Sequence, residues 1–311
     1  MKVLITCPPM LRIMDSFRDL FEVRGIELTT PDVVQTLAEH ELLQLVPQYD
    51  GWIIGDDPAT RKVFEAGHAG RLKAAVKWGV GVDNIDFSAC EDLGIQVAHT
   101  PNMFGAEVAD IALGYVIALG RRTFEIDRGV RAGEWPKFQG ISLAGRTAAL
   151  LGLGDIGRNL ARRLNALDMK VVAYDPQFPP IDGLESVELD TWPNRLSEAD
   201  FIIATCNLTP SSRHMLNKQT LHSAKMGVRV INVSRGAIID EAALIEALAS
   251  ERVYSAALDV FEEEPLPADS PLRDHSRCVF GSHNGSNTRD AVERTSRLVI
   301  TRLFEFLGLE S

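Results

Sequence analysis

Three glycines have the types and the spacing of a phosphate-binding turn. Gly152, Gly154 and Gly157 form the pattern G-x-G-x-x-G. The first glycine permits a tight turn, the second lets the backbone approach a pyrophosphate, and the third lets a helix pack closely on a strand. The N–H groups at the start of that helix, with the positive end of its dipole, would bind the phosphates. The spacing therefore predicts a dinucleotide site. We expect these residues to contact the cofactor: Gly152, Gly154, Asp155, Ile156 and Gly157.

The segments around this turn supply the elements that such a site needs. An apolar run at residues 148–151 predicts a buried strand, and Ile156, Leu160 and Leu164 have the spacing of a helix. A second apolar run, 171–174, ends at Asp175, whose carboxylate can accept hydrogen bonds from both hydroxyls of the adenosine ribose. Because that carboxylate would repel a 2′-phosphate, the predicted cofactor is NAD rather than NADP.

The composition is that of a globular protein and excludes several classes of function. Of the 311 residues, 45% are hydrophobic and 24% are charged, and the net charge of −11 argues against a surface that binds nucleic acid. No apolar run reaches the length of a membrane span, so no membrane partner is expected. The four cysteines include no C-x-x-C pair. No metal site is predicted, and isolated thiols of this kind indicate a reducing, cytoplasmic location.

Strands and helices alternate along the chain, which predicts α/β units with parallel sheets. The first unit is expected to comprise residues 1–99 and 285–311, and a second unit, 100–284, is inserted into it and holds the glycine turn. The fold class is therefore α/β, with two doubly wound parallel-sheet domains, a Rossmann NAD-binding domain inserted into a flavodoxin-like domain. In the first unit we expect strands at 3–6, 26–30, 51–54, 74–77 and 96–98, and helices near 10–23, 39–46, 59–66 and 87–93.

The rest of the inserted unit continues the alternation. Further strands are expected at 201–204, 229–233, 255–258 and 278–281, and helices after Ser211, at 218–225 and at 240–249. The last helix, near 288–307, returns the chain to the first unit, and Asn287 and Asp290 are placed to cap it as a pair.

Residues 105–122 are predicted to form a helix that is apolar almost all round, with Val108, Ile111, Val116 and Ile117 among its apolar positions. A helix with so little polar surface is covered on more than one side. We expect it to pack against its own unit and against a second copy of the chain, which predicts a homodimer. The alternative is a helix enclosed between the two units of one chain.

Several motifs follow the predicted strand ends. Residues 233–236 read Val-Ser-Arg-Gly, 259–265 read Asp-Val-Phe-Glu-Glu-Glu-Pro and 282–284 read Ser-His-Asn, while 79–86 read Gly-Val-Gly-Val-Asp-Asn-Ile-Asp and 100–102 read Thr-Pro-Asn. In this order they resemble the D-isomer-specific 2-hydroxyacid dehydrogenases, in their phosphoglycerate-dehydrogenase-like branch. The resemblance runs from the first strand to the last helix. It implies an NAD-dependent enzyme that acts on a small 2-keto or 2-hydroxy acid, with the first unit as its substrate domain.

The resemblance implies three catalytic residues. Arg235 matches the arginine that grips the substrate carboxylate and polarises the carbonyl, and Glu264 and His283 match the acid–imidazole pair. A guanidinium stabilises the negative charge that builds on the carbonyl oxygen. Imidazole exchanges a proton near neutral pH, and an adjacent carboxylate stabilises its protonated form. All three residues follow predicted strand ends, which meet at one crevice in an open α/β sheet.

The resemblance also implies binding residues. The backbone N–H groups of Val80 and Gly81 match the loop that cradles the substrate carboxylate, where Arg235 and His283 also bind the substrate. Asp259 matches the acid that holds the nicotinamide carboxamide. The implied cofactor contacts beyond the glycine turn and Asp175 are Cys206, Asn207, Val233, Ser234, Arg235, Asp259 and His283.

The residues near the carboxylate loop give opposed indications of whether the substrate carries a second anionic group. Lys77, just before the carboxylate loop, and Arg12, after the first strand, are cations that could bind a second anionic group. Asp56 and Asp57 follow the third strand and would disfavour a phosphate tail. Solvated surface charges are the alternative for each.

Two departures from the family pattern and two rival functions stay open. Asn207 stands where many members have proline, and Asn284 where many have a small or apolar residue. A formate- or phosphite-type dehydrogenase on the same fold is one rival, although Glu264 and Val80 argue against it. The second is an NAD-sensing, corepressor-like binding protein, which would not need the acid–imidazole pair.

Overall fold

The computed structural model describes residues 1–177 and 183–309. The chain forms two compact units, Met1–Met103 with Asn287–Ser311, and Phe104–Ser286. The chain therefore passes between the units a few residues beyond positions 99 and 284. Residues 310–311, the end of the expected first unit, lie outside the described residues.

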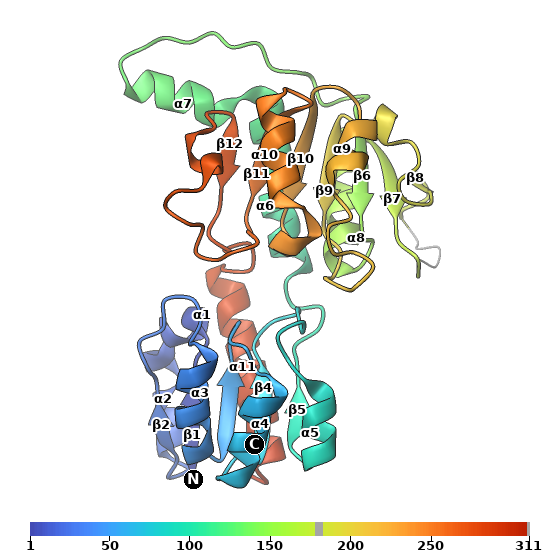
Figure 1. Ribbon diagram of the computed structural model, residues 1–311. Coiled ribbons are helices and arrows are strands. Elements are labelled where there is room, and N and C mark those ends of the chain that lie inside the picture. Colours follow the sequence, from blue (N-terminus) through green and yellow to red (C-terminus); the bar gives the residue numbers. More distant parts are fainter. Residues whose placement is uncertain (178–182, 310–311) are drawn as a thin grey trace. The chain divides into compact units, whose positions relative to one another are not determined.

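The first unit is built on a parallel sheet of five strands with the order β2-β1-β3-β4-β5 (Figure 1). Its strands are β1 (Lys2–Ile5), β2 (Glu27–Thr29), β3 (Gly51–Ile54), β4 (Ala74–Lys77) and β5 (Gln96–Ala98). The order reverses direction beside β1, as in doubly wound sheets, and the central β3 and β4 are buried along their whole length.

Helices cover both faces of this sheet. They are α1 (Pro8–Leu11), α2 (Arg18–Glu22), α3 (Glu39–Leu45), α4 (Arg61–Ala69), α5 (Phe87–Leu93) and α11 (Arg289–Phe306). On one face, α3, α4 and α5 pack on Trp52 and Ala75 in a single apolar core. The long α11 packs on β3 and β4, and its Phe304 meets Phe21 of α2 edge to face, with ring centroids 5.2 Å apart.

The second unit contains a parallel sheet of seven strands with the order β12-β11-β10-β9-β6-β7-β8 (Figure 1). Its strands are β6 (Thr147–Leu151), β7 (Lys170–Tyr174), β8 (Val187–Leu189), β9 (Phe201–Ala204), β10 (Val228–Asn232), β11 (Val253–Leu258) and β12 (Cys278–Phe280). From β6, the sheet extends through β7 and β8 on one side and through β9, β10, β11 and β12 on the other. The point where the order reverses, between β6 and β9, is where such sheets bind ligands.

The helices of the second unit are α6 (Gly105–Arg121), α7 (Thr123–Arg131), α8 (Asp155–Ala166), α9 (Lys218–Ser223) and α10 (Glu241–Ala249). Apart from α7, which projects away from the sheet, they lie on its two faces (Figure 1). Helices α6 and α8 pack together on one face, while α9 and α10 share a core with the other face. Among the described residues, no helix is long and apolar enough to cross a membrane.

Three of the expected elements differ in the structure. The segment 10–23 is not one helix: Met10, Met14, Phe17 and Phe21 are buried, but a 3₁₀ turn at Met14–Ser16 separates α1 from α2. The segment after Ser211 forms turns, because Ser212 Oγ bonds with Thr209 N–H and the Asn207 carbonyl and so competes with helical bonding. Helix α11 is capped by Thr288, which accepts from Ala291 N–H, and not by the pair Asn287 and Asp290.

Helix α6 is covered by its own unit on one face only. Val108, Ala112 and Val116 are buried, whereas Asp110, Ile117 and other residues of the opposite face are exposed. Arg122 ends the helix in the left-handed region with φ 57°, and α7 follows with no buried residue among those described. One face of the helix is thus left for a second copy of the chain, as the sequence predicts.

Candidate active site

The glycine turn connects β6 to α8 at the point where the strand order reverses. Gly152 has φ 91°, and a Cβ on it would lie 2.6 Å from the Cα of Cys206. A Cβ on Gly157 would lie 2.2 Å from the Gly152 carbonyl oxygen, so only glycine lets α8 pack this closely. Gly154 faces open space, and as the helix N-cap it offers no side chain to the first N–H groups of α8. These features fit a pyrophosphate at the helix start.

Asp175 lies beside the glycine turn, at the end of β7. Its Oδ2 accepts a hydrogen bond from Leu153 N–H at 2.7 Å, and its Oδ1 accepts from Gln177 N–H at 2.9 Å. A carboxylate held next to the phosphate-binding turn is where the adenosine ribose of a dinucleotide is recognised. The arrangement therefore fits NAD.

The strand beside β6 contributes Thr205, which the sequence did not single out, next to the predicted cofactor contact Cys206. Thr205, at the end of β9, donates through Oγ1 to the carbonyls of Leu151 (3.0 Å) and Gly152 (2.9 Å), and so fixes the glycine turn. The next residue, Cys206, accepts at its carbonyl a hydrogen bond from Ser234 Oγ. Burial raises the pKa of the Cys206 thiol to about 11, which keeps it protonated at neutral pH.

The turn that carries Arg235 is shaped by a buried asparagine. Asn232 ends β10, where its Oδ1 accepts from Ser234 N–H at 3.1 Å and its Nδ2 donates to the Arg235 carbonyl at 2.9 Å. The Arg235 guanidinium donates to the Ser234 carbonyl at 3.0 Å. In the sequence, this role of Asn232 was indicated only by its being a polar residue at the end of an apolar strand. Val233, Ser234 and Arg235 thus follow β10 on a rigid turn.

Asp259, directly after β11, is buried and organises the segment that carries His283. Its carboxylate accepts from the N–H groups of Asn284 (3.2 Å) and Gly285 (2.8 Å), and its carbonyl accepts from His283 N–H at 2.7 Å. Tyr115 of α6 bonds with the same carboxylate, and burial together with that carboxylate raises the pKa of the Tyr115 hydroxyl. Nothing in the sequence pattern indicated this role for Tyr115.

Glu264 and His283 form the acid–imidazole pair in the structure. His283 Nδ1 and Glu264 Oε2 are 2.7 Å apart, and Glu264 Oε1 accepts from Phe261 N–H at 3.0 Å. His283 has φ 54°, an unusual backbone conformation for a residue other than glycine. Because β10, β11 and β12 are neighbours, Arg235, Glu264 and His283 follow three adjacent strands at the carboxyl edge of one sheet.

The other predicted substrate residues belong to the first unit. Val80 and Gly81 lie in residues 79–84, which we call the amide loop, after β4. Its start is fixed by Thr100, which accepts from Gly79 N–H at 2.9 Å. In the part of the chain that the structure describes, the N–H groups of Val80 and Gly81 donate to no protein acceptor. Lys77 is only 2% exposed, and its ammonium bonds with the Gly55 carbonyl and Asp56.

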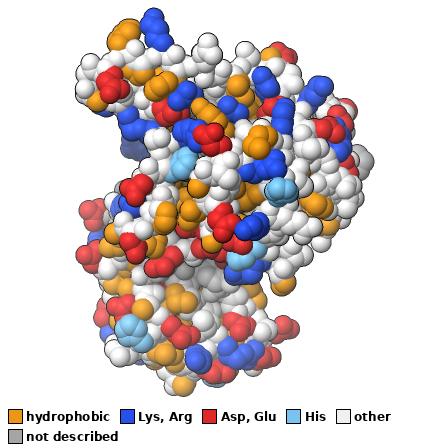
Figure 2. Space-filling model, turned by 45° about the horizontal axis from the view of Figure 1, so that its top comes forward, with side chains coloured by type: hydrophobic (Ala, Val, Ile, Leu, Met, Phe, Trp, Pro, Cys, Tyr) orange, Lys and Arg blue, Asp and Glu red, His pale blue; other side chains and the backbone are white. Residues whose placement is uncertain are grey.

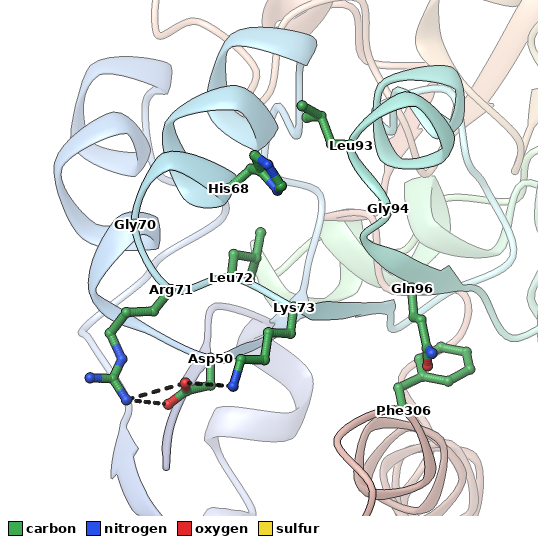
Figure 3. Close-up of a pocket in the computed structure, with 10 residues that line it drawn as sticks. All are labelled: Asp50, His68, Gly70, Arg71, Leu72, Lys73, Leu93, Gly94, Gln96 and Phe306. Atoms are coloured by element: carbon green, nitrogen blue, oxygen red, sulfur yellow. Dashed lines mark hydrogen bonds and ion pairs between the residues drawn. The ribbon is translucent and has the colours of Figure 1, made fainter.

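A cavity of about 600 Å³ opens at the other end of the first unit's sheet (Figure 3). Asp50, Arg71 and Lys73 line it, together with His68 and Phe306. The dashed lines in Figure 3 join the Asp50 carboxylate to Arg71 (2.9 Å) and to Lys73 (3.8 Å). Asp50 and Lys73 precede β3 and β4, so the cavity lies at the amino ends of these strands. The amide loop follows the carboxyl end of β4, and α/β sheets bind substrates at the carboxyl ends of their strands.

Comparison with known proteins identifies the family. Residues 113–285 match the model of the D-isomer specific 2-hydroxyacid dehydrogenase, NAD binding domain. The chain is 35% identical over 293 residues to a hydroxypyruvate reductase of Thermotoga maritima, covering 91% of this chain and 94% of that protein. The chain belongs to the D-isomer-specific 2-hydroxyacid dehydrogenases. It is an NAD-dependent oxidoreductase of this family, and NAD is its cofactor.

Two further comparisons agree with this assignment. A D-3-phosphoglycerate dehydrogenase of Methanocaldococcus jannaschii is 34% identical over 311 residues, which is 98% of this chain but 57% of that protein. The chain thus spans little more than half of that relative. The crystal structure of the TT0316 protein from Thermus thermophilus superposes with a TM-score of 0.87 at 32% identity, covering 100% of this chain and 98% of that chain. The predicted fold class of two parallel-sheet α/β domains is confirmed.

Proposed function

We propose that this dehydrogenase reduces small 2-keto acids to D-2-hydroxy acids with NADH and catalyses the reverse oxidation. The observation that carries the proposal is the 2.7 Å contact between His283 Nδ1 and Glu264 Oε2 at the carboxyl edge of the nucleotide-binding sheet. A protein that only senses NAD needs no proton relay. This pair therefore favours an enzyme over a corepressor-like binding protein.

The cofactor would be held by the residues around the switch point of the sheet. The glycine turn and the first N–H groups of α8 would bind the pyrophosphate, and Asp175 the adenosine ribose. Cys206, Asn207, Val233, Ser234 and Asp259 would line the nicotinamide end. When bound, NADH supplies the hydride that reduces the keto carbon.

Arg235 and the amide loop would hold the substrate. The guanidinium of Arg235 would bind the substrate carboxylate and lie beside the carbonyl oxygen, where negative charge develops. The N–H groups of Val80 and Gly81 would bind the same carboxylate. Support comes from their lack of a protein acceptor in the described chain, which leaves these partly exposed N–H groups available to a ligand.

His283 would supply the proton that completes the reduction. With Nδ1 bonded to Glu264, Nε2 is the nitrogen that passes a proton to the developing alkoxide, and the neutral ring takes it back in the oxidation direction. Glu264 stabilises the imidazolium and fixes the ring orientation. Formate- and phosphite-type activities are disfavoured, because Glu264 stands where the formate enzymes have glutamine, and Val80 where phosphite oxidation needs a cation.

We also propose that the enzyme is a homodimer that uses α6, as the sequence predicts, together with α7 and the segment after it. Of the eleven large hydrophobic side chains exposed in the described chain, five lie between residues 117 and 138: Ile117, Phe124, Val130, Trp135 and Phe138. Figure 2 shows hydrophobic side chains beside Lys and Arg at the upper left of the view, where α7 lies. A second copy would bury this surface by a self-complementary contact.

A cytoplasmic location is proposed for the enzyme. All four cysteines are free, and Cys7, Cys90 and Cys278 are buried. Burial raises the pKa of Cys90 to about 12 and that of Cys278 to about 11, so these thiols remain protonated. Unpaired thiols of this kind fit a reducing compartment.

The experiment that tests the function follows the loss of NADH absorbance over a panel of 2-keto acids, with glyoxylate, pyruvate, hydroxypyruvate and branched-chain keto acids as members. We expect turnover with at least one of them, and a D configuration of the product by chiral chromatography. NADH binding without oxidation of NADH by any member of the panel would favour the binding-protein alternative.

A further inference from the structure

Lys77 is a charged residue in the interior of the first unit. It ends β4 and is 2% exposed, and its Nζ donates to the Gly55 carbonyl at 2.5 Å and to Asp56 Oδ1 at 2.8 Å. An ammonium group in the interior is costly unless it is paired and hydrogen-bonded. Both acceptors of Lys77 belong to residues 55–57, which we call the aspartate turn.

The aspartate turn is also bound from the far end of the amide loop. Asn84 Nδ2 donates to the Gly55 carbonyl at 3.2 Å and to the Asp57 carbonyl at 2.7 Å. Lys77 precedes the amide loop and Asn84 closes it, so side chains flanking the loop on both sides bind the same carbonyl oxygen. Val80 and Gly81, whose N–H groups we assign to the substrate carboxylate, lie between these two anchors.

Buried hydrogen bonds to Asp57 hold the aspartate turn in place. The Asp57 carboxylate is fully buried, and it accepts from Leu37 N–H at 2.8 Å, from Gly55 N–H at 3.1 Å and from Thr6 Oγ1. A backbone hydrogen bond also joins the two segments, since Ala59 N–H donates to the Asn84 carbonyl at 3.0 Å. The two anchors therefore connect the amide loop to a rigid part of the unit.

The charges of this cluster decide what the substrate can carry. The cation of Lys77 faces the carboxylate of Asp56, whose side chain is 39% exposed, whereas Asp57 is fully buried and satisfied within the protein. A phosphate or second carboxylate near this turn would therefore meet the partly exposed carboxylate of Asp56 and a cation that is already neutralised. An uncharged substrate tail would meet no such repulsion.

We propose that Lys77 is a positioning residue, which joins the aspartate turn to the amide loop and holds the N–H groups of Val80 and Gly81 for a substrate whose tail carries no second anion. This inference rests on the proposed function. It replaces the direct contact between Lys77 and substrate that the sequence suggested, because both the burial and the partners of Lys77 point to the protein itself.

The test compares hydroxypyruvate with 3-phosphohydroxypyruvate, which differ only by the phosphate. We expect the wild-type enzyme to prefer hydroxypyruvate by at least about tenfold in kcat/KM. Lys77→Met should raise KM about tenfold for both compounds, with kcat and the Kd of NADH nearly unchanged. Asn84→Ala should act in the same way, and the double variant should lose no more than the stronger single change. A KM increase confined to 3-phosphohydroxypyruvate would overturn the proposal, as would a wild-type preference for that compound.

Hydrogen exchange provides a readout that does not depend on turnover. Peptides over residues 79–86 should exchange faster in Lys77→Met and Asn84→Ala, while peptides over α8 stay protected. Lys73→Met is the matched control. Lys73 lies just before β4, whereas Lys77 is the last residue of that strand, and the Lys73 side chain is 66% exposed. Unchanged exchange in Lys77→Met would refute the positioning role. If the wild-type enzyme reduces no 2-keto acid, the proposed function fails while the exchange experiment still decides whether Lys77 holds the loop.

Discussion

His283 and Glu264 are bonded through Nδ1 and Oε2 at 2.7 Å although they follow different strands, β12 and β11. The contact depends on two backbone features. His283 adopts φ 54°, and Glu264 is held through its second oxygen by Phe261 N–H. A carboxylate fixed in this way orients the imidazole and stabilises its charged form, which is what a general acid at neutral pH requires.

Replacement of His283 by alanine should lower kcat by roughly a hundredfold or more, because the alkoxide would lose its proton donor. The Kd of NADH, measured by fluorescence titration, should stay nearly the same. His222→Ala is the control, since His222 is exposed in the last turn of α9 and is not among the proposed site residues. Normal turnover in the His283 variant would remove this residue from the mechanism.

The sequence predicted the sheets well because their strands are short apolar runs. The expected strands at 51–54, 74–77, 96–98 and 201–204 coincide with β3, β4, β5 and β9. Helices were less certain, since periodicity reports which face is buried and not whether the backbone is continuous. Met10, Met14, Phe17 and Phe21 are all buried, yet they belong to α1, a 3₁₀ turn and the start and interior of α2.

The candidate site could be predicted only where a motif carries the chemistry. The glycine turn is such a motif, and its geometry follows from the three glycines. Thr205, Asn232 and Tyr115 act by holding other residues, and their types are common at strand ends and in helices. Such supporting contacts depend on the three-dimensional arrangement, which no spacing in the sequence encodes. The roles of the individual site residues in binding and catalysis, including those of Arg235, Glu264 and His283, remain predictions.

Replacement of Asp175 by asparagine should reduce the preference for NADH over NADPH at least about tenfold in the ratio of kcat/KM values. The variant removes the charge that would repel a 2′-phosphate, but its amide oxygen can still accept the bond from Leu153 N–H. The glycine turn should therefore keep its shape. Asp168→Asn is the control. Asp168 is an exposed residue that precedes β7, whereas Asp175 follows the same strand. An unchanged cofactor ratio would mean that Asp175 does not face the ribose.

Asp50 should stabilise the first unit in a pH-dependent way. Burial alone would raise the pKa of its carboxyl, but hydrogen bonds from Lys2 N–H and Arg71, with the charges of Arg71 and Lys73, lower that pKa below its ordinary value of 3.8. Because the folded state favours the ionised form, this stabilisation is present above pH 3.8 and is lost as the pH falls through the lowered value.

Replacement of Asp50 by asparagine should accordingly lower the free energy of unfolding by about 1–3 kcal/mol at pH 7, as for a buried charged hydrogen bond. Urea unfolding followed by circular dichroism should show this difference shrinking as the pH is lowered below 3.8. Asp92→Asn weakens only the exposed pair with Arg61 and should change stability much less than Asp50→Asn does. Equal effects of the two substitutions at pH 7 would contradict the role of Asp50.

Trp135→Glu should shift the enzyme from dimer toward monomer. The Trp135 side chain is 77% exposed within one chain and lies in the apolar surface that we assign to the second copy. A buried carboxylate without a partner at such a contact is costly, and aromatic residues contribute most to interfaces of this kind. Light scattering after gel filtration should give twice the 34.2 kDa of one chain for the wild-type enzyme.

The same measurement over a dilution series should show a dimer dissociation constant at least about tenfold higher for Trp135→Glu. Met226→Glu is the matched control, because Met226 is a similarly exposed apolar residue of the same unit, outside residues 117–138. That variant should remain a dimer. A monomeric wild-type enzyme, or a Trp135→Glu variant that dimerises as tightly as the wild type, would exclude this surface as the dimer contact, and the exposed face of α6 would then need another explanation.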